Sequence, residues 1–288
     1  MPELPEVETM ARELAPLIVG ATIGQAWTDW PAAVRHPDVA GYLAALPGRR
    51  MVAVRRRAKW LVIELDRGAL VIQVKMTGQL TVVSATMPRD PYVHATWTFT
   101  DGRELRLRDV RKFARIGAYD EAALKVTLDQ HGPEPLGADF TVAAFRKRLR
   151  ARRARLKPLL LDQAFLAGVG NIYADEALWR ARLHPLRHAT SLRRRDERRL
   201  YQGLRGVLQE AIDRRGSSIN DYTAPEGDGE MQEHLDVYQR TGQPCHRCGR
   251  PIRRIVIGAR GTHFCSWCQR LSRSERDASA ARLLRGGA

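Results

Sequence analysis

The sequence predicts an α+β protein of more than one domain. A first helix is followed by period-two apolar alternation up to about residue 120, which indicates antiparallel β-structure. From about residue 141 the apolar spacing becomes helical, and all four cysteines lie after residue 244 in a short β-like segment. With 288 residues, the chain is long enough for two ordinary domains with buried cores.

Residues 4–18 form the predicted first helix. Pro5 suits a first helical turn, where a missing N–H costs nothing. The apolar residues from Val7 to Ile18 recur at helical spacing, and Gly20 ends the segment.

The segment from residue 22 to 120 is predicted to be an antiparallel β-sandwich. Strand-like runs occupy 60–65, 69–74, 95–100 and 104–108. Asp101 and Gly102 stand between the last two runs, and this pair favours a tight hairpin turn. We therefore expect residues 1–130 to form an N-terminal β-sandwich domain.

The second half is predicted to be helical and to end in a small cysteine-bearing domain. Residues 131–140 contain prolines and glycines typical of a linker. Helical spacing covers 141–152, 157–165, 171–180 and 189–215, and a Gly- and acid-rich loop covers 216–230. We expect a helical domain over 141–235, a cysteine-bearing domain over 236–270, and a disordered tail over 271–288.

The charge balance points to a polyanionic partner. Lys and Arg number 48 against 32 Asp and Glu, which gives a net charge of +16. Such an excess favours nucleic acid. No apolar run approaches the length of a membrane span, and the acidic, Pro-containing N-terminus does not resemble a secretory signal. We expect a cytoplasmic protein without a membrane partner.

Four cysteines have the spacing of a metal site. Cys245 and Cys248 form one Cys-x2-Cys knuckle, and Cys265 and Cys268 form a second. Two knuckles give four thiolates on one tetrahedral zinc ion. A site with four protein ligands has no open position, so the predicted zinc is structural. His246 and His263 are expected to be neighbours of the knuckles rather than ligands.

Cationic residues cluster most densely in residues 146–157. Eight of these twelve residues are Lys or Arg, among them Arg152, Arg153 and Lys157, and local acids cannot neutralise them all. The run indicates a surface that follows a phosphate backbone. Gly168 and Gly170 then allow a close approach to phosphate, and Asn171 can either cap the next helix or donate to that phosphate.

The N-terminal PELPEV segment can carry chemistry. Removal of Met1 would give Pro2 a free secondary amine, and an α-amino pKa near ~8, against ~10.4 for lysine, leaves a useful fraction unprotonated. Such an amine forms an iminium with an aldehyde-level carbon, which can drive elimination. Glu3 and Glu6 lie beside it at a helix N-terminus, which favours carboxylates.

Taken together, these segments resemble the bacterial formamidopyrimidine-DNA glycosylases of the Fpg/Nei class. The likeness runs from Met1 to about Arg270. It rests, in family order, on MPELPEVET, RRRAKWLVIEL, KMTGQL, RDVRKF, GPEPL, LLDQAFLAGVGNIYADEALWRARLHP, VYQRTGQPCHRCG and GARGTHFCSWCQ. The resemblance implies a helix-two-turn-helix DNA-binding domain over 141–235 and a four-cysteine β-hairpin zinc finger over 236–270.

The resemblance also implies catalytic roles. Pro2 matches the nucleophile that forms a Schiff base with C1′ of the damaged nucleotide. Glu3 matches the acid/base of sugar opening, and Glu6 matches a supporting carboxylate. Lys59 matches the lysine of β-elimination, and Arg260 matches an arginine of phosphate binding and δ-elimination. Lys157 and Asn171 match contacts to the flanking phosphates.

Other positions match residues that handle the DNA. Met76, Arg111 and Phe113 match the three residues that fill the gap left by the everted nucleotide, with Lys112 between them; the alternative for Met76 and Phe113 is ordinary core packing. Residues 216–230 resemble a lid over the flipped purine, in which Ser217 and Tyr222 would read the lesion.

Several positions depart from the family pattern without removing a catalytic group. They put the details of DNA wedging and the opposite-base preference in question. Tyr92 stands where the family has a DNA-contacting histidine, and the remaining departures are Gln73, Lys75, Val110 and Ala114.

The implied function is base excision repair. A monomeric bifunctional enzyme would excise 8-oxoguanine and formamidopyrimidines from double-stranded DNA, and would cut the strand there and at abasic sites by β,δ-elimination. One alternative is the sister activity on oxidised pyrimidines; the ELPEV start and the long 216–230 loop favour the purine branch. A second alternative is a non-catalytic zinc-finger DNA binder, which Glu3, Glu6 and Lys59 argue against.

Overall fold

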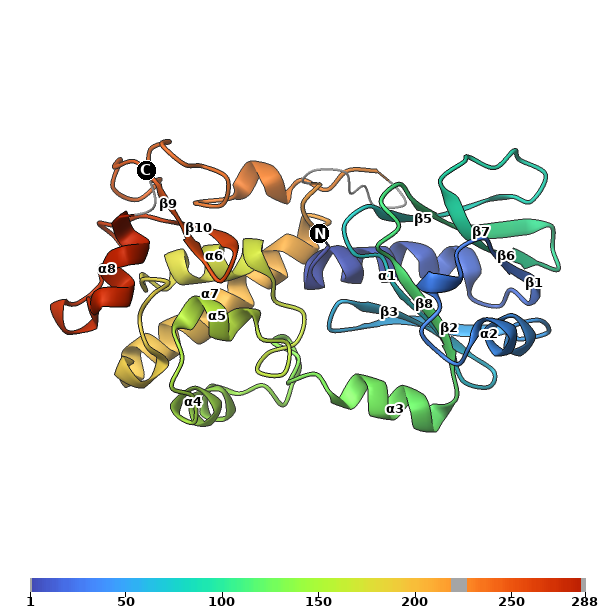
Figure 1. Ribbon diagram of the computed structural model, residues 1–288, viewed down its shortest axis with the longest axis horizontal. Helices are drawn as coiled ribbons and strands as arrows, with labels where there is room; N and C mark the ends of the chain where they lie inside the picture. The colour runs from blue at the N-terminus through green and yellow to red at the C-terminus, as the bar shows by residue number, and fades with distance from the viewer. Residues whose placement is uncertain (1, 219–226, 286–288) are drawn as a thin grey trace. The chain divides into compact units, whose positions relative to one another are not determined.

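The computed structural model describes residues 2–218 and 227–285 (Figure 1). The chain forms two compact units. The N-terminal unit comprises Met1–Gln130 and Ile212–Gln232, and the C-terminal unit comprises His131–Ala211 and Glu233–Ala288. Within the described residues, no helix has the length and apolar character that a bilayer crossing requires.

The N-terminal unit is built on two four-stranded antiparallel sheets. One sheet has the order β1-β6-β7-β5 and the other β2-β3-β4-β8. The strands are β1 (Ile23–Thr28), β2 (Met51–Arg57), β3 (Trp60–Leu65), β4 (Ala69–Gln73), β5 (Gly78–Ser84), β6 (Val93–Phe99), β7 (Arg103–Asp109) and β8 (Arg115–Tyr119).

A single apolar core joins the two sheets and the first helix, so the predicted β-sandwich is confirmed. Helix α1 (Leu4–Ile18) contributes Met10 and Leu14 to the core, while Ile63 comes from one sheet and Trp97 from the other. All four side chains are fully buried. The unit also contains η1 (Pro31–Ala33), α2 (Val39–Ala45) and α3 (Glu121–Asp129).

Residues that follow the helical region return to this N-terminal unit. Arg215 pairs with Glu13 of α1 at 2.7 Å, and the Ser217 backbone N–H donates to the Glu6 carboxylate at 2.8 Å. The unit boundaries at 211 and 233 therefore differ from the expected helical domain 141–235, because two acids of α1 bind the chain beyond residue 213.

The C-terminal unit contains the predicted helices and the β-hairpin. The 171–180 helix lies where it was expected, whereas the helices expected over 157–165 and 189–215 begin or end several residues away from those limits. The elements are α4 (Val142–Arg150), α5 (Leu156–Leu161), α6 (Asn171–Arg180), η2 (Ala189–Ser191), α7 (Arg194–Asp213), η3 (Met231–His234), β9 (Arg253–Ile257), β10 (Arg260–Phe264), η4 (Arg273–Glu275) and α8 (Ala278–Arg285); the last residues of α7 and the first of η3 group with the N-terminal unit.

The C-terminal segment 271–288 is not a disordered tail over its described part. Asp277 caps α8 by accepting a bond from the Ala280 N–H at 2.7 Å and also pairs with Arg155 at 2.9 Å. Ala280 is fully buried, and Leu283 and Leu284 pack on the same small core as Phe264 of the finger hairpin. Three apolar residues at i, i+3 and i+4 thus form a helix because β9 and β10 supply a surface to cover.

Candidate active site and nucleic-acid interface

The first turn of α1 gathers two buried carboxylates at the predicted catalytic end. Glu3 and Glu6 form a reciprocal capping box, in which the Glu3 N–H donates to Glu6 Oε2 at 2.8 Å. Glu3 is 3% exposed and Glu6 1%, and Pro2 is also buried. The structure therefore brings Pro2, Glu3 and Glu6 together as expected.

Glu6 also binds the start of the segment that resembles a lid. Its Oε1 accepts from the Ser217 N–H at 2.8 Å and from the Ser217 hydroxyl at 3.1 Å. Gly216 has a φ of +76°, and a Cβ there would lie 2.9 Å from Glu6 Oε1, so only glycine allows this approach. The predicted Tyr222 lies outside the described residues.

Lys59 lies in the two-residue turn between β2 and β3. Arg57 pairs with Trp60 across this turn, and Ala58 has a φ of +54°. Arg56 donates to the Ala58 carbonyl at 3.0 Å and pairs with Glu8 of α1 at 3.2 Å. The turn that carries Lys59 is therefore tied to the second turn of α1.

Lys75 adds a second lysine close to this turn. It is half-buried, with a φ of +56°. Burial lowers the pKa of Lys75, and the positive charges of Arg115, Lys59 and Arg35 lower it further. The departure from the family pattern at position 75 thus places one more cation near Lys59.

Asp109 organises the two loops that carry the predicted wedge residues. The side chain is fully buried at the end of β7. Its Oδ2 accepts from the backbone N–H groups of Phe113 and Ala114 at 2.8 and 2.7 Å. Its Oδ1 accepts from the Thr77 hydroxyl, next to Met76. The carboxylate therefore joins the 110–114 turn to the loop that carries Met76.

The predicted wedge side chains of the 110–114 turn are exposed to solvent. Arg111 and Lys112 are exposed, Phe113 is 40% exposed and Met76 is half-buried. The Arg111 guanidinium lies 4.8 Å above the Phe113 ring. The exposed Phe113 ring is therefore not core packing, and insertion into DNA stays a prediction for it.

Tyr92 is exposed and directly precedes β6. The Arg108 guanidinium lies 5.2 Å from its ring, and the Tyr92 N–H donates to Asp90 at 2.7 Å. The backbone is fixed there while the ring remains accessible.

Asn171 connects the helical part of the C-terminal unit to the finger hairpin. Its side-chain amide donates to the Gly261 carbonyl at 2.9 Å, next to Arg260. Arg260 follows a turn in which Gly258 and Ala259 both have positive φ, and its side chain is exposed. The structure thus brings Asn171 to the backbone of the residue that follows Arg260.

Lys157 does not lie at the surface. It is fully buried, and its Nζ donates to Asp175 at 2.6 Å and to the Asn171 carbonyl at 2.8 Å. Buried and paired, its ammonium positions Asn171 and is not presented for direct contact with phosphate. Arg152 and Arg153, between α4 and α5, are exposed, as expected for a cationic surface.

Two buried acids of α6, which the sequence analysis missed, hold the finger. Asp175 accepts from the His263 N–H at 2.9 Å, and Glu176 accepts from the three consecutive N–H groups of residues 236–238 at 2.8–2.9 Å. Burial raises the pKa of Glu176 to about 7 although these N–H groups favour its charged form. Adjacent acids in the apolar helix NIYADEALW are the signal that could have identified them.

The four cysteines form the predicted metal centre. Their sulfur atoms all lie within 4.8 Å of one another, and the cluster contains no histidine. His263 Nδ1 lies 3.2 Å from Asp175, and His246 Nδ1 lies 3.0 Å from Asp236. Four thiolates fit one tetrahedral structural zinc ion, and both histidines are neighbours as predicted.

Three family models match consecutive parts of the chain. Residues 1–116 match the formamidopyrimidine-DNA glycosylase N-terminal domain, and residues 131–223 match the H2TH domain of the same glycosylases. Residues 242–271 match a zinc finger found in FPG and IleRS.

Relatives and solved structures agree over almost the whole chain. Formamidopyrimidine-DNA glycosylase of Herpetosiphon aurantiacus is 45% identical over 93% of this chain and 100% of its own length. The crystal structure of MutM (FPG) from Thermus thermophilus is 43% identical, with a TM-score of 0.84 and coverage of 93% and 98%. A Lactococcus lactis FPG mutant bound to a Fapy-dG-containing DNA is 37% identical, with a TM-score of 0.88 and coverage of 94% and 100%.

Proposed function

The chain belongs to the formamidopyrimidine-DNA glycosylase family, and on that premise we propose a bifunctional DNA repair enzyme. It excises oxidised purines such as 8-oxoguanine and formamidopyrimidines from double-stranded DNA and then cuts the strand. The observation that carries the proposal is the buried carboxylate pair Glu3 and Glu6 beside Pro2, in a chain whose relatives share this architecture.

Pro2 is the proposed nucleophile once Met1 is removed. Its secondary amine attacks C1′ of the damaged nucleotide, the glycosidic bond breaks, and the base leaves with a proton. Glu3 supplies the acid/base function that opens the sugar ring, and the resulting iminium is cationic without further protonation. Glu6 holds the backbone of Glu3 at 2.8 Å and so fixes the position of the nucleophile.

Strand cleavage follows from the iminium. The electron sink acidifies C2′, β-elimination expels the 3′ phosphate, and δ-elimination expels the 5′ phosphate. Lys59 transfers the proton in the first elimination, and Arg260 binds the phosphate and assists the second. The products are phosphates on both ends of a one-nucleotide gap.

The remaining site residues handle the DNA. Met76, Arg111 and Phe113 fill the gap left by the everted nucleotide, and Lys112 and Tyr92 contact the duplex nearby. Arg152, Arg153 and Asn171 bind phosphates, while Lys157 holds Asn171 in place. Ser217 and Tyr222 belong to the segment that reads the lesion. The zinc ion supports the finger and takes no part in bond making.

Borohydride trapping tests the nucleophile. Reductant should cross-link the wild-type protein to an 8-oxoguanine duplex, and Pro2→Gly should abolish the cross-link. Pro5→Ala, in the first turn of α1 three residues further on, is the matched control and should still be trapped. Undiminished trapping of Pro2→Gly would exclude Pro2 as the nucleophile.

Substrate choice and assembly have their own tests. Excision of 8-oxoguanine opposite cytosine should exceed excision of thymine glycol, and the reverse order would assign the pyrimidine branch. An absence of nicking on every damaged duplex would instead indicate a non-catalytic binder.

We further propose that the enzyme acts as a monomer on bacterial nucleoid DNA. Sedimentation of the enzyme with and without a lesion duplex measures the stoichiometry.

A further inference from the structure

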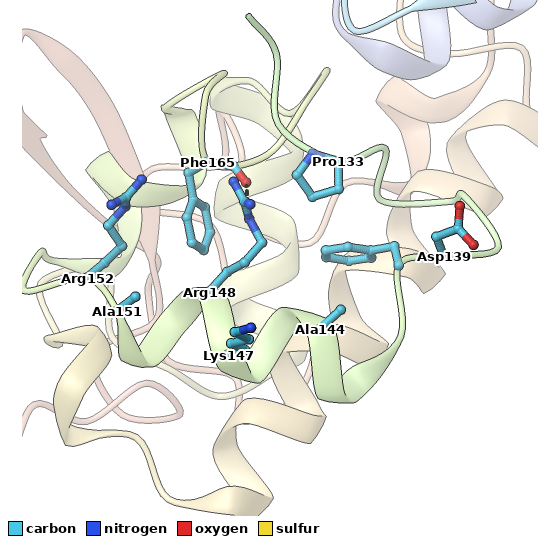
Figure 2. A pocket seen from close by; sticks show the side chains of 9 residues that line it. Pro133, Asp139, Ala144, Lys147, Arg148, Ala151, Arg152 and Phe165 are labelled. Atoms are coloured by element: carbon cyan, nitrogen blue, oxygen red, sulfur yellow. Dashed lines mark hydrogen bonds between the residues drawn. The ribbon is translucent and has the colours of Figure 1, made fainter. Parts of the chain in front are cut away.

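A pocket of about 510 Å³ lies in the C-terminal unit, beside α4 (Figure 2). Two phenyl rings, Phe140 and Phe165, and the Pro133 ring form its apolar part. Both phenylalanines are almost fully buried, at 2% and 1% exposure, so their position is fixed by the core beneath them. Pockets of this size and apolar character accept large side chains or small ligands.

One face of α4 forms a wall of this pocket. Ala144, Lys147, Arg148 and Ala151 recur at i, i+3, i+4 and i+7, which places them on one side of the helix. The two alanines leave space between the cationic side chains, while Phe145 and neighbouring apolar residues of α4 face the core.

The cations on the two sides of α4 have different partners. Arg146 and Arg150, outside the pocket, pair with the buried Glu197 at 2.7 and 2.9 Å. On the pocket side, Arg148 donates to the backbone carbonyl of Phe165 at 3.1 Å, and Figure 2 shows it beside the Phe165 ring.

The pocket rim therefore carries an unbalanced positive charge. Lys147, Arg148 and Arg152 line it, and no carboxylate pairs with any of them in the part of the chain that the structure describes. Asp139 is the one acid among the lining residues. Three cations and one carboxylate give the rim a net charge of +2.

This combination selects a ligand with both an apolar and an acidic part. A bare phosphate would make no favourable contact with the apolar floor. A neutral hydrocarbon would leave the charged rim without a counter-ion. We propose that the pocket binds a short acidic peptide segment of a partner protein, with a large apolar side chain against Pro133, Ala144 and Ala151, above the two buried phenyl rings, and flanking carboxylates at the rim. Charge complementarity favours a peptide over nucleic acid, because a duplex presents phosphates and keeps its apolar base faces stacked.

Fluorescence anisotropy with the full-length protein tests the proposal. The probe is a labelled peptide, Gly-Asp-Glu-Asp-Asp-Leu-Phe. We expect saturable binding that weakens roughly tenfold or more when the acids become amides, and equally when Leu and Phe become Ala. No saturable binding, or equal binding of either altered peptide, would overturn the proposal.

Variants of the α4 wall locate the site. Ala144→Trp fills the pocket and Lys147→Glu reverses one rim charge, and each should weaken peptide binding roughly tenfold. Lys125→Glu, on α3 of the N-terminal unit, is the matched charge control and should bind as wild type. Circular dichroism should be unchanged in all three, and strand nicking should be unchanged in Ala144→Trp and Lys125→Glu.

Two results would reject this pocket as the site. One is peptide binding that survives in Ala144→Trp, or falls equally in Lys125→Glu. The other is a single-stranded oligonucleotide that displaces the peptide and itself loses affinity in Ala144→Trp, which would make the pocket a nucleic-acid site.

Discussion

Two fully buried aspartates, one in each unit, organise the predicted DNA-contacting residues in opposite ways. Asp109 receives its bonds from neutral donors, namely the Thr77 hydroxyl and backbone N–H groups of the 110–114 turn. Asp175 instead pairs with Lys157, itself fully buried, and with the backbone and ring of His263.

The difference decides which cations remain available to DNA. Since Asp109 binds neutral donors alone, Arg111 and Lys112 stay exposed on the loop it fixes. Since the buried Asp175 carboxylate needs a countercharge, it pairs with Lys157. The Lys157 ammonium also donates to the Asn171 carbonyl and so holds Asn171 in position. A basic residue within a predicted DNA-binding run can therefore serve the interior of the protein rather than its surface.

Loss of the zinc centre should affect the C-terminal unit and leave the N-terminal unit intact. We expect this change to have the largest effect. Cys248→Ser removes one of four thiolates, and structural zinc contributes about 10–16 kcal/mol of apparent binding energy in finger peptides. Zinc content and DNA affinity should fall sharply while the N-terminal unit stays folded, as measured by metal analysis, DNA titration and limited proteolysis. An unchanged DNA affinity would refute the role of the finger.

Asp175→Asn should be the next most damaging change. It leaves the Lys157 ammonium buried without its countercharge, which costs about 3–5 kcal/mol in comparable sites. Denaturant unfolding should show this loss in the C-terminal unit. The double variant Asp175→Asn with Lys157→Met removes the stranded charge and should recover part of the stability. A double variant no better than the single one would contradict the ion-pair explanation.

Asp109→Asn should have a smaller effect on stability and a selective effect on activity. The amide keeps only one acceptor oxygen, so its NH2 group faces either the N–H groups of Phe113 and Ala114 or the N–H of Arg111, and an unsatisfied buried polar group costs about 1–3 kcal/mol. Excision of intact lesions should fall more than cleavage at preformed abasic sites, in paired nicking assays. Arg111→Ala is the control: it removes one side chain without releasing the loop, so stability should hold while the same selectivity appears. Equal loss on both substrates would argue against a wedge.

The smallest expected effect is a pH dependence confined to the C-terminal unit. His184 is buried against Phe264, its Nδ1 accepts from the Leu186 N–H at 3.1 Å, and burial lowers the pKa of His184 to about 3. The unfolded chain takes up this proton near pH 6.5 and the folded one does not. The contribution of His184 to the free energy of unfolding is therefore fully present above pH 6.5 and is lost as the pH falls toward 3.

Between pH 6.5 and 5.5 the loss from His184 should be about 1 kcal/mol. Denaturant unfolding at the two pH values measures it, and His184→Asn, which keeps an acceptor but does not titrate, should flatten the difference. The same slope in His184→Asn would assign the effect to other groups.

Local signals predicted the elements that depend on nearby residues. The Asp101–Gly102 turn, the 171–180 helix and the paired Cys-x2-Cys knuckles all followed from short-range patterns, and the structure confirms them. The catalytic and DNA-contact roles came from the family resemblance, and they remain predictions.

Features that depend on distant residues could not be read from the sequence. Lys157 belongs to a cationic run, and only the fold places it against Asp175 on another helix. Asp109 meets Thr77 across 32 residues. The tail folds as α8 because the finger hairpin gives its few apolar side chains a surface to cover. In each case the deciding partner comes from another element of the chain.

The bond between Ser217 and Glu6 spans 211 residues. During translation, the N-terminal sandwich therefore emerges from the ribosome long before Ser217, which completes the environment of Glu6, has been synthesised. A nascent or truncated chain that ends before Ser217 could form the apolar core. It would leave Glu6 Oε1 without the Ser217 backbone N–H and the Ser217 hydroxyl. Completion of the predicted catalytic end is thereby delayed until helices α4 to α7 have been translated.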